Sequence, residues 1–253
     1  MSLLALRRLS RHYAGIAAVD RVDLDVPGGG VHALIGPNGA GKTTLFNLIS
    51  GLVAPSAGTI VLDGTDVTRR GPEVRARLGI ARTFQNIRIF GAMTALENVL
   101  TGLHPRFASG LGAVLVGLRR VRREERQALD RAGEALALVG LQRLAGAPAA
   151  TLSYGDARRL EIARAIAGAP RLLLLDEPAA GMNPAETMAL AALVRLIAQA
   201  GTTVLLVEHD MRFVMGLADS VTVLNFGRCI FHGAAEAARR DPAVIEAYLG
   251  RRG

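Results

Sequence analysis

The stretch GPNGAGKT at residues 36–43 has the residue types and spacing of a loop that binds phosphate. It matches the pattern GxxxxGK[ST] and lies between an apolar strand-like segment, VHALI, and a segment expected to be helical. Glycines let backbone N–H groups converge on phosphate oxygens, and the start of the helix adds a partial positive charge. Lys42 is the only lysine in a chain with 30 lysine and arginine residues. We expect its compact ammonium to reach the β- and γ-phosphates of a nucleotide, where a planar guanidinium would fit badly.

The same loop defines the expected nucleotide site. The Thr43 hydroxyl is a candidate ligand of Mg²⁺. The residues of this segment that we expect to contact the nucleotide are Gly36, Pro37, Asn38, Gly39, Ala40, Gly41, Lys42, Thr43 and Thr44. The alternative is an ordinary glycine-rich turn with a surface lysine, but a chance match to the full pattern between a strand and a helix is rare.

A second segment, RLLLLDEP at residues 171–178, supplies the carboxylates that such a loop needs. Four consecutive leucines indicate a strand that is buried on both faces. Asp176 at its carboxyl end is expected near Mg²⁺, through water, and Glu177 is a candidate to orient or deprotonate the attacking water. Taken alone, Asp-Glu-Pro after a strand is an ordinary loop start. Its combination with the glycine loop favours a site that hydrolyses a nucleotide.

The periodicity of the chain predicts the elements that position these two segments. Strand-like and helix-like segments alternate, which indicates an α/β fold with a mainly parallel sheet. We expect three strands within residues 1–35, a helix that ends at Gly51, a strand over 78–84, and a last helix that begins at Pro242. Residues 91–169 are expected to be almost wholly helical. The sequence therefore predicts one domain over 1–253, with a core formed by 1–90 and 170–253 and a helical insertion at 91–169.

Composition narrows the class of protein. No stretch reaches the ~18 uninterrupted apolar residues of a membrane-spanning helix, and LGAVLVGL at 111–118 is too short. The first residues, MSLLALRRLSRHY, lack the order of a secretory signal, so we expect a cytoplasmic protein. The single cysteine, Cys229, agrees with that compartment. A net charge of +8 fits nucleic acid, an anionic membrane face or a phosphate-bearing ligand equally well.

Three further motifs follow in a fixed order, and with them the sequence resembles the nucleotide-binding subunits of ABC transporters over essentially the whole chain. FQN at 84–86 resembles the glutamine loop of that family, LSYGD at 152–156 its signature motif, and EHD at 208–210 its histidine switch. Tyr13 stands where the family places an aromatic residue that stacks on adenine. Each has an ordinary alternative: a helix N-cap for Ser153, a satisfied histidine at a strand end for His209, and a core aromatic for Tyr13.

The resemblance implies a fold, a mechanism and a set of partners. The fold is an ABC-type P-loop NTPase core with an N-terminal antiparallel β subdomain and a helical insertion. ATP and Mg²⁺ are the implied cofactors, and each ATP lies between two subunits packed head to tail. The implied roles are catalytic for Glu177, His209, Gln85 and Lys42, metal-binding for Thr43, Gln85 and Asp176, and nucleotide-binding for Tyr13, Ser153 and Gly155 in addition to the glycine loop.

Longer segments indicate which subfamily of ABC transporters the sequence resembles. RTFQNIRIF, LDEPAAGMNP and DPAVIEAYLG resemble the ATP-binding subunit of importers for branched-chain amino acids, although related systems carry other amino acids, amides or urea. The implied partners are a second related ATPase, two permease subunits and, indirectly, an extracytoplasmic solute-binding protein. The ATPase pair would be a heterodimer in the cell, or a homodimer when the chain is isolated, at the cytoplasmic face of the membrane. Tyr154, Asp156 and Asn183 depart from the general family pattern, which has Gly, Gln and Asp there.

Rival functions make different demands on the sequence. ABC-type ATPases that act on ribosomes carry two tandem cassettes, and those that act on DNA insert a long coiled coil, neither of which is present. The run RRVRREER at 119–126 is interpreted as a solvated helix face rather than a nucleic-acid site. A nucleotide-binding regulator without hydrolysis is disfavoured because the site residues Lys42, Asp176, Glu177 and His209 are intact. An exporter ATPase for lipids or lipopolysaccharide is disfavoured by the segments AAGMNP and DPAVIEAYLG. If a permease docks beside the Gln85 loop, the apolar residues of IRIF at 87–90 should be partly exposed.

Overall fold

The computed structural model describes residues 2–103 and 119–249, and its centre is a six-stranded sheet. The strand order is β10-β9-β3-β8-β7-β6. The bounds are β3 (Val31–Ile35), β6 (Ile80–Arg82), β7 (Leu172–Asp176), β8 (Thr203–Val207), β9 (Ser220–Asn225) and β10 (Arg228–Ala234). Neighbours from β9 to β6 run parallel, and only β10 is antiparallel. Because β3, β7 and β8 are buried at every position, both faces of the sheet must be covered.

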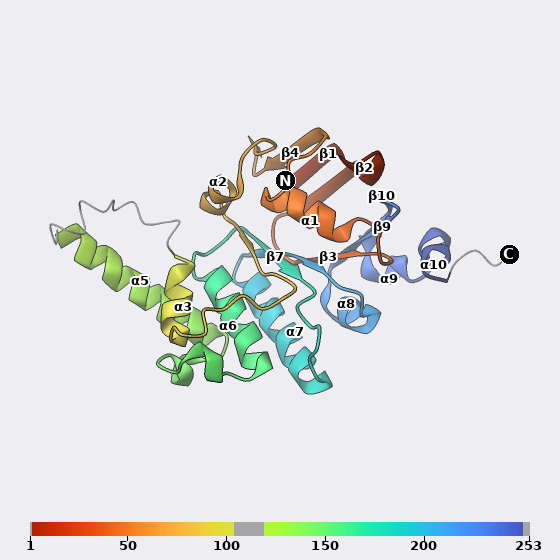
Figure 1. Cartoon of the computed structure of the whole chain (residues 1–253). Helices are drawn as coiled ribbons and strands as arrows, with labels where there is room; N and C mark the ends of the chain where they lie inside the picture. The colour runs from red at the N-terminus through yellow and green to blue at the C-terminus, as the bar shows by residue number, and fades with distance from the viewer. Residues whose placement is uncertain (1, 104–118, 250–253) are drawn as a thin grey trace.

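One face is covered by α1 and a second sheet. That sheet is antiparallel, with the order β2-β1-β4-β5, and its strands are β1 (Ser2–Tyr13), β2 (Ile16–Pro27), β4 (Ala57–Leu62) and β5 (Thr65–Asp66). Helix α1 (Lys42–Ser50) lies between the two sheets, and its apolar side chains join the core that both sheets share (Figure 1). The short helix α2 (Pro72–Arg77) begins at a proline, as expected.

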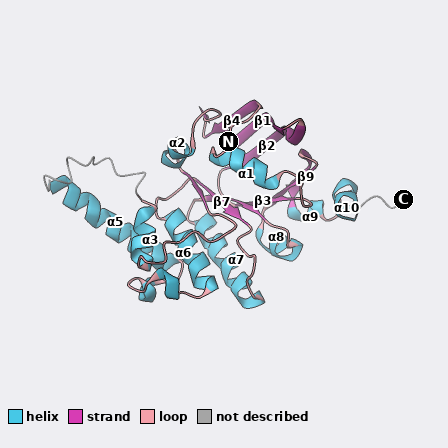
Figure 2. Cartoon of the chain, in the orientation of Figure 1, coloured by secondary structure: helices cyan, strands magenta, loops and turns pink. Residues whose placement is uncertain are grey.

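Helices cover the other face of the parallel sheet (Figure 2). The helices on this side are α3 (Ala95–Thr101), α5 (Arg119–Leu138), α6 (Tyr154–Ile166), α7 (Pro184–Gln199), α8 (Met211–Leu217), α9 (Ala235–Ala238) and α10 (Pro242–Leu249), with two 3₁₀ turns, η2 (Gln142–Leu144) and η3 (Ala149–Thr151). Of these, α3 and α5 pack chiefly against α6 and against each other. Successive residues of one strand serve the two layers, since Leu173 and Leu175 pack against the helices while Leu172 and Leu174 pack toward α1.

Most of the expected elements are confirmed. The three strands within residues 1–35 are present, and α1 ends at Gly51, which adopts a left-handed conformation with φ 80°. The strand expected over 78–84 is shorter, because after Thr83 the chain leaves the sheet and the Phe84 N–H turns to Glu161 on α6. The expectation of almost continuous helix over 91–169 is wrong for residues 139–153, which form turns. Strand β5 and helix α9 were not expected, and LGAVLVGL at 111–118 lies outside the described residues.

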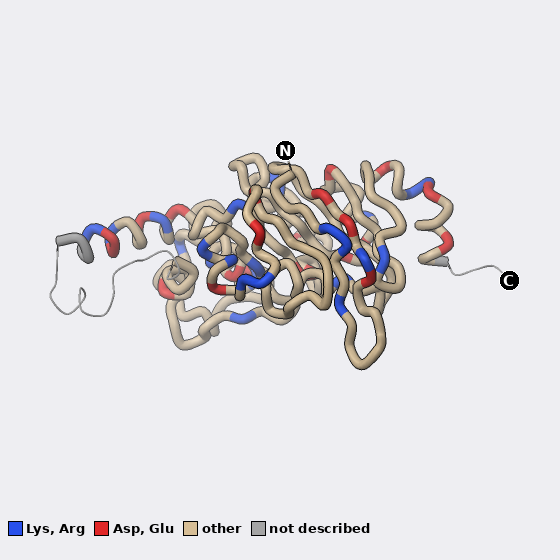
Figure 3. The backbone as a smooth tube through the Cα atoms, turned by 90° about the horizontal axis from the view of Figure 1, so that it is seen from above, with Lys and Arg blue, Asp and Glu red and all other residues tan. Residues whose placement is uncertain are grey.

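The arginine-rich run lies on the first part of α5, which projects from the molecule, whereas the second half of α5 packs against α3 and α6 (Figure 1). Blue and red segments alternate along this helix in Figure 3, and the side chains of Arg123, Glu125 and Arg126 are exposed. This agrees with a solvated helix face. Within the ranges 2–103 and 119–249, no helix has the length and hydrophobicity that a membrane crossing requires.

Candidate nucleotide-hydrolysis site

The carboxyl ends of four parallel strands bring most of the expected site residues to one edge of the sheet. The glycine loop follows β3, the Gln85 loop follows β6, Asp176 ends β7, and His209 follows β8. The register places Asp176 beside Val207 and Val207 beside Leu34. Ligands of open α/β sheets bind at this edge, so the topology gathers residues that lie far apart in the sequence.

The glycine loop is shaped by two glycines that no other residue could replace. A Cβ on Gly36 would lie 2.2 Å from the Leu224 carbonyl oxygen, and one on Gly41 would lie 2.3 Å from that of Ala18. Both have positive φ, 151° and 99°. Helix α1 starts directly afterwards, with no side-chain cap and no acidic residue in its first turn. Its first N–H groups therefore have no side-chain cap and can bind an anion.

The Lys42 ammonium is buried inside this loop. It donates to the carbonyl oxygens of Gly36 at 2.7 Å and Pro37 at 2.9 Å. Burial lowers the pKa of Lys42, and the nearby carboxylates of Glu177 and Asp176 oppose that shift. Lysine and the two carboxylates therefore lie within electrostatic range of one another. Phosphate oxygens of a nucleotide would replace the two carbonyls as partners of the ammonium.

Asp176 is buried and paired with a residue that the sequence analysis did not single out. Its Oδ2 lies 2.8 Å from a terminal nitrogen of Arg82, on the neighbouring strand β6. Arg82 also donates to Asn47 Oδ1 at 2.7 Å and to Ser50 Oγ at 3.0 Å, both on α1. The carboxylate is thus fixed to the helix that carries the phosphate loop. An arginine two residues before Phe84 gave no sequence signal of this role.

Glu177 and Gln85 are in direct contact. Gln85 Nε2 donates to Glu177 Oε2 at 3.0 Å. The Gln85 loop is held from below by Arg158, whose side chain donates to the carbonyl oxygens of Phe84 and Gln85, each at 2.8 Å. Arg158 forms a fully buried ion pair with Glu161 at 2.7 Å. This pair on α6 links the glutamine loop to the helical layer.

His209 and its neighbour Glu208 complete this edge. The His209 side chain is 64% exposed, and its Nδ1 lies 3.8 Å from Glu208 Oε2. Glu208 is 1% exposed, and burial raises the pKa of its carboxyl. The sequence analysis assigned no role to Glu208, although a carboxylate directly after a fully apolar strand was a signal that it could have used.

Within the described residues, the side chains of two expected regions make no hydrogen bond or ion pair with this cluster. Tyr13 lies at the end of β1, 41% exposed, and the Arg11 guanidinium carbon is 4.6 Å from its ring centroid. Ser153 caps α6, where its hydroxyl accepts from the Asp156 N–H at 3.1 Å and donates to Asp156 Oδ2 at 2.8 Å. Across 2–103 and 119–249, no hydrogen bond or ion pair connects Ser153 or Gly155 to the glycine loop.

The comparisons with known proteins decide the family. Residues 19–180 match the family model described as "ABC transporter". The chain belongs to this ABC transporter family of ATP-binding cassettes. Residues 228–253 of the cassette match a second model, described as "Branched-chain amino acid ATP-binding cassette transporter". The cassette is thus a nucleotide-binding ATPase with the fold that its sequence predicts.

Relatives of the cassette match it from end to end. It is 44% identical, over 98% of each chain, to the high-affinity branched-chain amino acid transport ATP-binding protein LivG of Escherichia coli K12. The crystal structure of the ADP conformation of MJ1267, an ATP-binding cassette of an ABC transporter, superposes with a TM-score of 0.86 at 31% identity, over 99% of this chain and 100% of the other. The dimeric post-hydrolysis structure of the cassette MJ0796 with ADP and Pi has a TM-score of 0.76 at 25% identity, over 92% and 98%.

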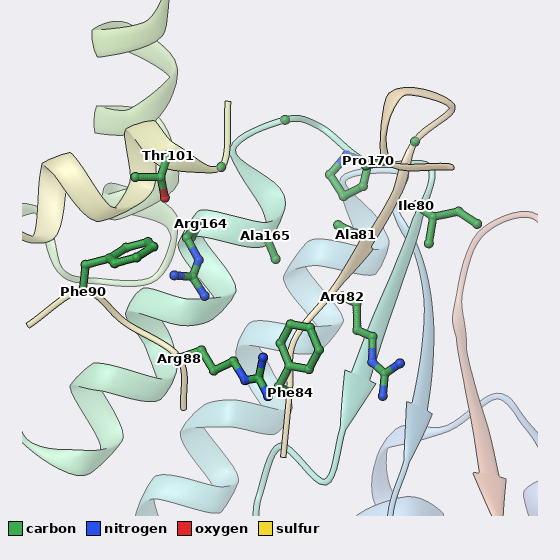
Figure 4. A pocket seen from close by; sticks show the side chains of 14 residues that line it. Ile80, Ala81, Arg82, Phe84, Arg88, Phe90, Thr101, Arg164, Ala165 and Pro170 are labelled. Atoms are coloured by element: carbon green, nitrogen blue, oxygen red, sulfur yellow. The ribbon is translucent and has the colours of Figure 1, made fainter. Parts of the chain in front are cut away.

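The cassette also carries a groove of 470 Å³ between the Gln85 loop and the helical layer. Figure 4 shows Phe84 beside Arg88 and Phe90 beside Arg164 at this groove. The two guanidinium carbons lie 4.6 Å and 5.9 Å from the respective ring centroids. Phe90 is 53% exposed, and Ile87 and Ile89 are half-buried. The expected partial exposure of residues 87–90 is confirmed.

Proposed function

We propose that this cassette is the ATP-binding and ATP-hydrolysing subunit that powers import of branched-chain amino acids through a membrane ABC transporter. The observation that carries the proposal is the match to LivG over 98% of each chain, together with the separate match of residues 228–253. None of the residues to which we assign a role in hydrolysis lies in this last segment, so its match supports the type of transporter rather than the chemistry. An importer of another amino acid, an amide or urea is the nearest alternative.

The proposed roles follow the geometry of the sheet edge. Lys42 binds the β- and γ-phosphates together with the N–H groups of residues 36–44, and Glu177 orients and deprotonates the attacking water. Gln85 contacts Glu177, and through this contact the position of the attacking water would depend on the position of the loop that carries Gln85. His209 is exposed beside Glu177's strand, and we assign it a hydrogen bond to a γ-phosphate oxygen. Tyr13, exposed beside Arg11, is assigned to adenine stacking.

The donor set fits Mg²⁺. Thr43 offers a hydroxyl, Gln85 an amide oxygen and Asp176 a carboxylate, and hard oxygen donors with few carboxylates are typical of sites where Mg²⁺ is shared with phosphates. The described residues contain no cluster of three or more His, Cys, Asp or Glu side chains that could hold a metal without a nucleotide. Bound Mg²⁺ would neutralise charge on the phosphates. Asp176, already tied to Arg82, would contact it through water.

A dimer is proposed because two of the assigned nucleotide-binding residues, Ser153 and Gly155, belong to the start of α6 and not to the sheet edge. Ser153 and Gly155 are at the start of α6 and are not connected to the glycine loop, so they would serve a nucleotide bound by a second cassette. The dimeric structure of the relative MJ0796 with ADP and Pi supports a dimer. In the cell the second cassette is proposed to be a related subunit, and the isolated chain would pair with itself.

The groove beside Gln85 is the proposed docking site for the two permease subunits, one on each cassette. Docking there would hold the cassette peripherally at the cytoplasmic face of the membrane, and an extracytoplasmic solute-binding protein would be an indirect partner. We propose residues 91–169 as the helical subdomain that forms one wall, and 1–90 with 170–253 as the core that forms the other. Arg88 and Arg164 at its lining favour a permease segment that carries carboxylates among apolar side chains.

The experiment that tests the function is an affinity purification of tagged Glu177→Gln from the membranes of its own cells with Mg-ATP. A variant that binds but does not hydrolyse ATP should hold the assembly closed. Recovery of a related ATPase and two permeases, identified by mass spectrometry, supports the importer, and ligand binding by the partner solute-binding protein names the cargo. Ribosomes or DNA-bound proteins without a permease would refute the transport role and leave only the ATPase.

A further inference from the structure

The burial of the Glu208 carboxylate is energetically unfavourable by itself. It follows β8 and is 1% exposed, and a carboxylate removed from water is destabilised by several kcal/mol unless its oxygens are hydrogen-bonded. In the described part of the chain, no arginine or lysine forms an ion pair with it, and the nearest cationic candidate is the His209 ring at 3.8 Å. Its oxygens must therefore be satisfied by other donors.

Those donors come from both catalytic loops. Glu208 Oε1 accepts from the Ala179 N–H at 2.9 Å, and Oε2 accepts from the His209 N–H at 3.1 Å. Ala179 is in the loop that carries Glu177, while His209 begins the loop after β8. One buried carboxylate thus joins the loop that carries the proposed base, Glu177, to the loop that carries His209, the residue proposed to donate a hydrogen bond to the γ-phosphate. A backbone bond from the Glu177 N–H to the Val207 carbonyl oxygen, 3.0 Å, runs alongside.

The backbone of Glu177 makes such support necessary. Its φ is 45°, a left-handed conformation that destabilises a residue other than glycine by about 1–3 kcal/mol. A strained residue keeps its conformation only where its surroundings hold it from both sides. The Val207 carbonyl holds Glu177 itself, and Glu208 holds the chain two residues further on.

We propose that Glu208 is a positioning residue for ATP hydrolysis, which fixes Glu177 and His209 relative to each other by binding the backbone of both loops. Because its side chain is 1% exposed, it would act through those two residues and not by direct contact with nucleotide or water. The inference rests on the proposed roles of Glu177 and His209. It adds a direct structural link between them, through which a movement of one loop reaches the other.

The chemistry of the two acceptors defines the test. Glu208→Gln keeps the side-chain volume but presents one NH₂ group to an N–H donor, so one of the two bonds is lost. Glu208→Asp keeps both acceptor oxygens on a shorter stem. We expect kcat for ATP hydrolysis to fall about 10- to 100-fold in Glu208→Gln and less in Glu208→Asp, because small displacements of reacting groups reduce rates by such factors. KM for ATP should stay within about twofold, because the Lys42 loop is unchanged.

A second measurement tests the link without turnover. Amide hydrogen exchange followed by mass spectrometry should show faster exchange of both 176–182 and 206–212 in Glu208→Gln. The matched control is Thr222→Val, which removes another buried hydrogen bond, to His232 at 2.8 Å, on β9 and outside the site. It should leave kcat and the exchange of both loops unchanged.

The outcomes separate the two proposals. If Glu208→Gln retains wild-type kcat, or if exchange rises in one loop only, the positioning role is wrong. If Glu208→Gln fails to fold, Glu208→Asp decides, because its stem is one methylene shorter and should not reach the Ala179 and His209 N–H groups at once, so unchanged kcat and exchange in that variant also overturn the role. If the wild-type chain does not hydrolyse ATP at all, the proposed function fails, and the exchange experiment still tests the link between the loops.

Discussion

Lys42, Asp176 and Glu208 are each less than one tenth exposed, whereas Ser153 and Tyr154 at the start of α6 lie on the surface. The first group is held by elements from distant parts of the sequence: the sheet, α1 and the Arg82 contacts. The second is held mainly by its own helix. The Ser153 hydroxyl bonds only within residues 153–156, and Tyr154 reaches across to the Ala180 carbonyl oxygen at 3.0 Å.

The difference shows how one chain can carry two halves of one site with different rigidity. The edge of the sheet is preorganised, so its groups are ready for a nucleotide at little cost in rearrangement. In the proposed dimer, the signature segment, residues 152–156, would gain its function only when another chain brings a nucleotide to it. Substitutions at the sheet edge should therefore change the isolated chain, while those at the signature segment should change the dimer.

The largest effect is expected at Glu177. Glu177→Gln keeps the size of the side chain and removes the carboxylate that would take a proton, so we expect turnover to fall at least about 100-fold. Binding of Mg-ATP should remain within about threefold of wild type, because Lys42 and its loop are unchanged. Phosphate release and fluorescence titration with a labelled nucleotide measure the two quantities. Near-normal turnover would remove Glu177 from the role of catalytic base.

The next effect concerns nucleotide affinity. Lys42→Arg keeps the charge but places a planar guanidinium in a pocket formed by the carbonyls of Gly36 and Pro37. We expect the affinity for Mg-ATP to fall about 100-fold, measured by equilibrium titration. Arg171→Lys, the reverse exchange at an exposed pair with Asp63, is the matched control and should have no effect. If wild type and Lys42→Arg bind Mg-ATP with equal affinity, the proposal that only lysine fits the glycine loop is wrong.

The same contrast explains what the sequence could predict. Lys42, Asp176 and Glu177 sit at fixed distances from strand ends, and parallel strands bring their carboxyl ends together. Arg82 could not be assigned, and Glu208 could have been noted only as a carboxylate after an apolar strand, because the roles of both depend on which strands are neighbours: β6 beside β7, and β7 beside β8. The pairing of strands is decided by contacts far apart in the sequence, which periodicity along one chain does not record.

The helical region shows a second limit. Residues 139–153 were expected to be helical but form turns, because Gly140, with φ 75°, ends α5 and the segment that follows bonds to the loop before α3. Ala149 N–H donates to the Met93 carbonyl oxygen at 2.9 Å, and Ala95 N–H donates to that of Ala147 at 3.0 Å. These tertiary bonds replace the helical ones. Local propensity in an alanine-rich segment could not reveal them.

A smaller effect is expected at the signature segment. Ser153→Ala removes the N-cap of α6, which should lower the free energy of unfolding by about 1 kcal/mol. Mg-ATP binding to the monomer should not change, whereas ATPase activity at concentrations that support dimers should fall about 10-fold. Thr151→Val, which removes a neighbouring exposed hydroxyl bonded to Pro148, is the control. If Ser153→Ala weakens Mg-ATP binding to the monomer, the signature segment and the sheet edge do not act as separate parts of the site.

The smallest effect tests the departure at Asp156, whose carboxylate accepts from Ser153 and forms an ion pair with Arg159. A negative charge in the first turn stabilises α6 by about 0.3–1 kcal/mol, but in a dimer it would face the phosphates of the other subunit's nucleotide. Asp156→Gln should therefore lower the unfolding free energy slightly and strengthen ATP-dependent dimerisation about threefold to fivefold.

Sedimentation of the Asp156→Gln, Glu177→Gln double variant with Mg-ATP measures the dimer, and urea unfolding measures the stability. Glu97→Gln provides the matched control, because Glu97 occupies the same first-turn position in α3 and bonds to its N-cap Thr94. It should lose stability in the same way and leave the dimer unchanged. A weaker dimer in the Asp156 variant would instead mean that the Asp156–Arg159 pair supports the closed state, and that the signature segment of this cassette is preorganised like the sheet edge.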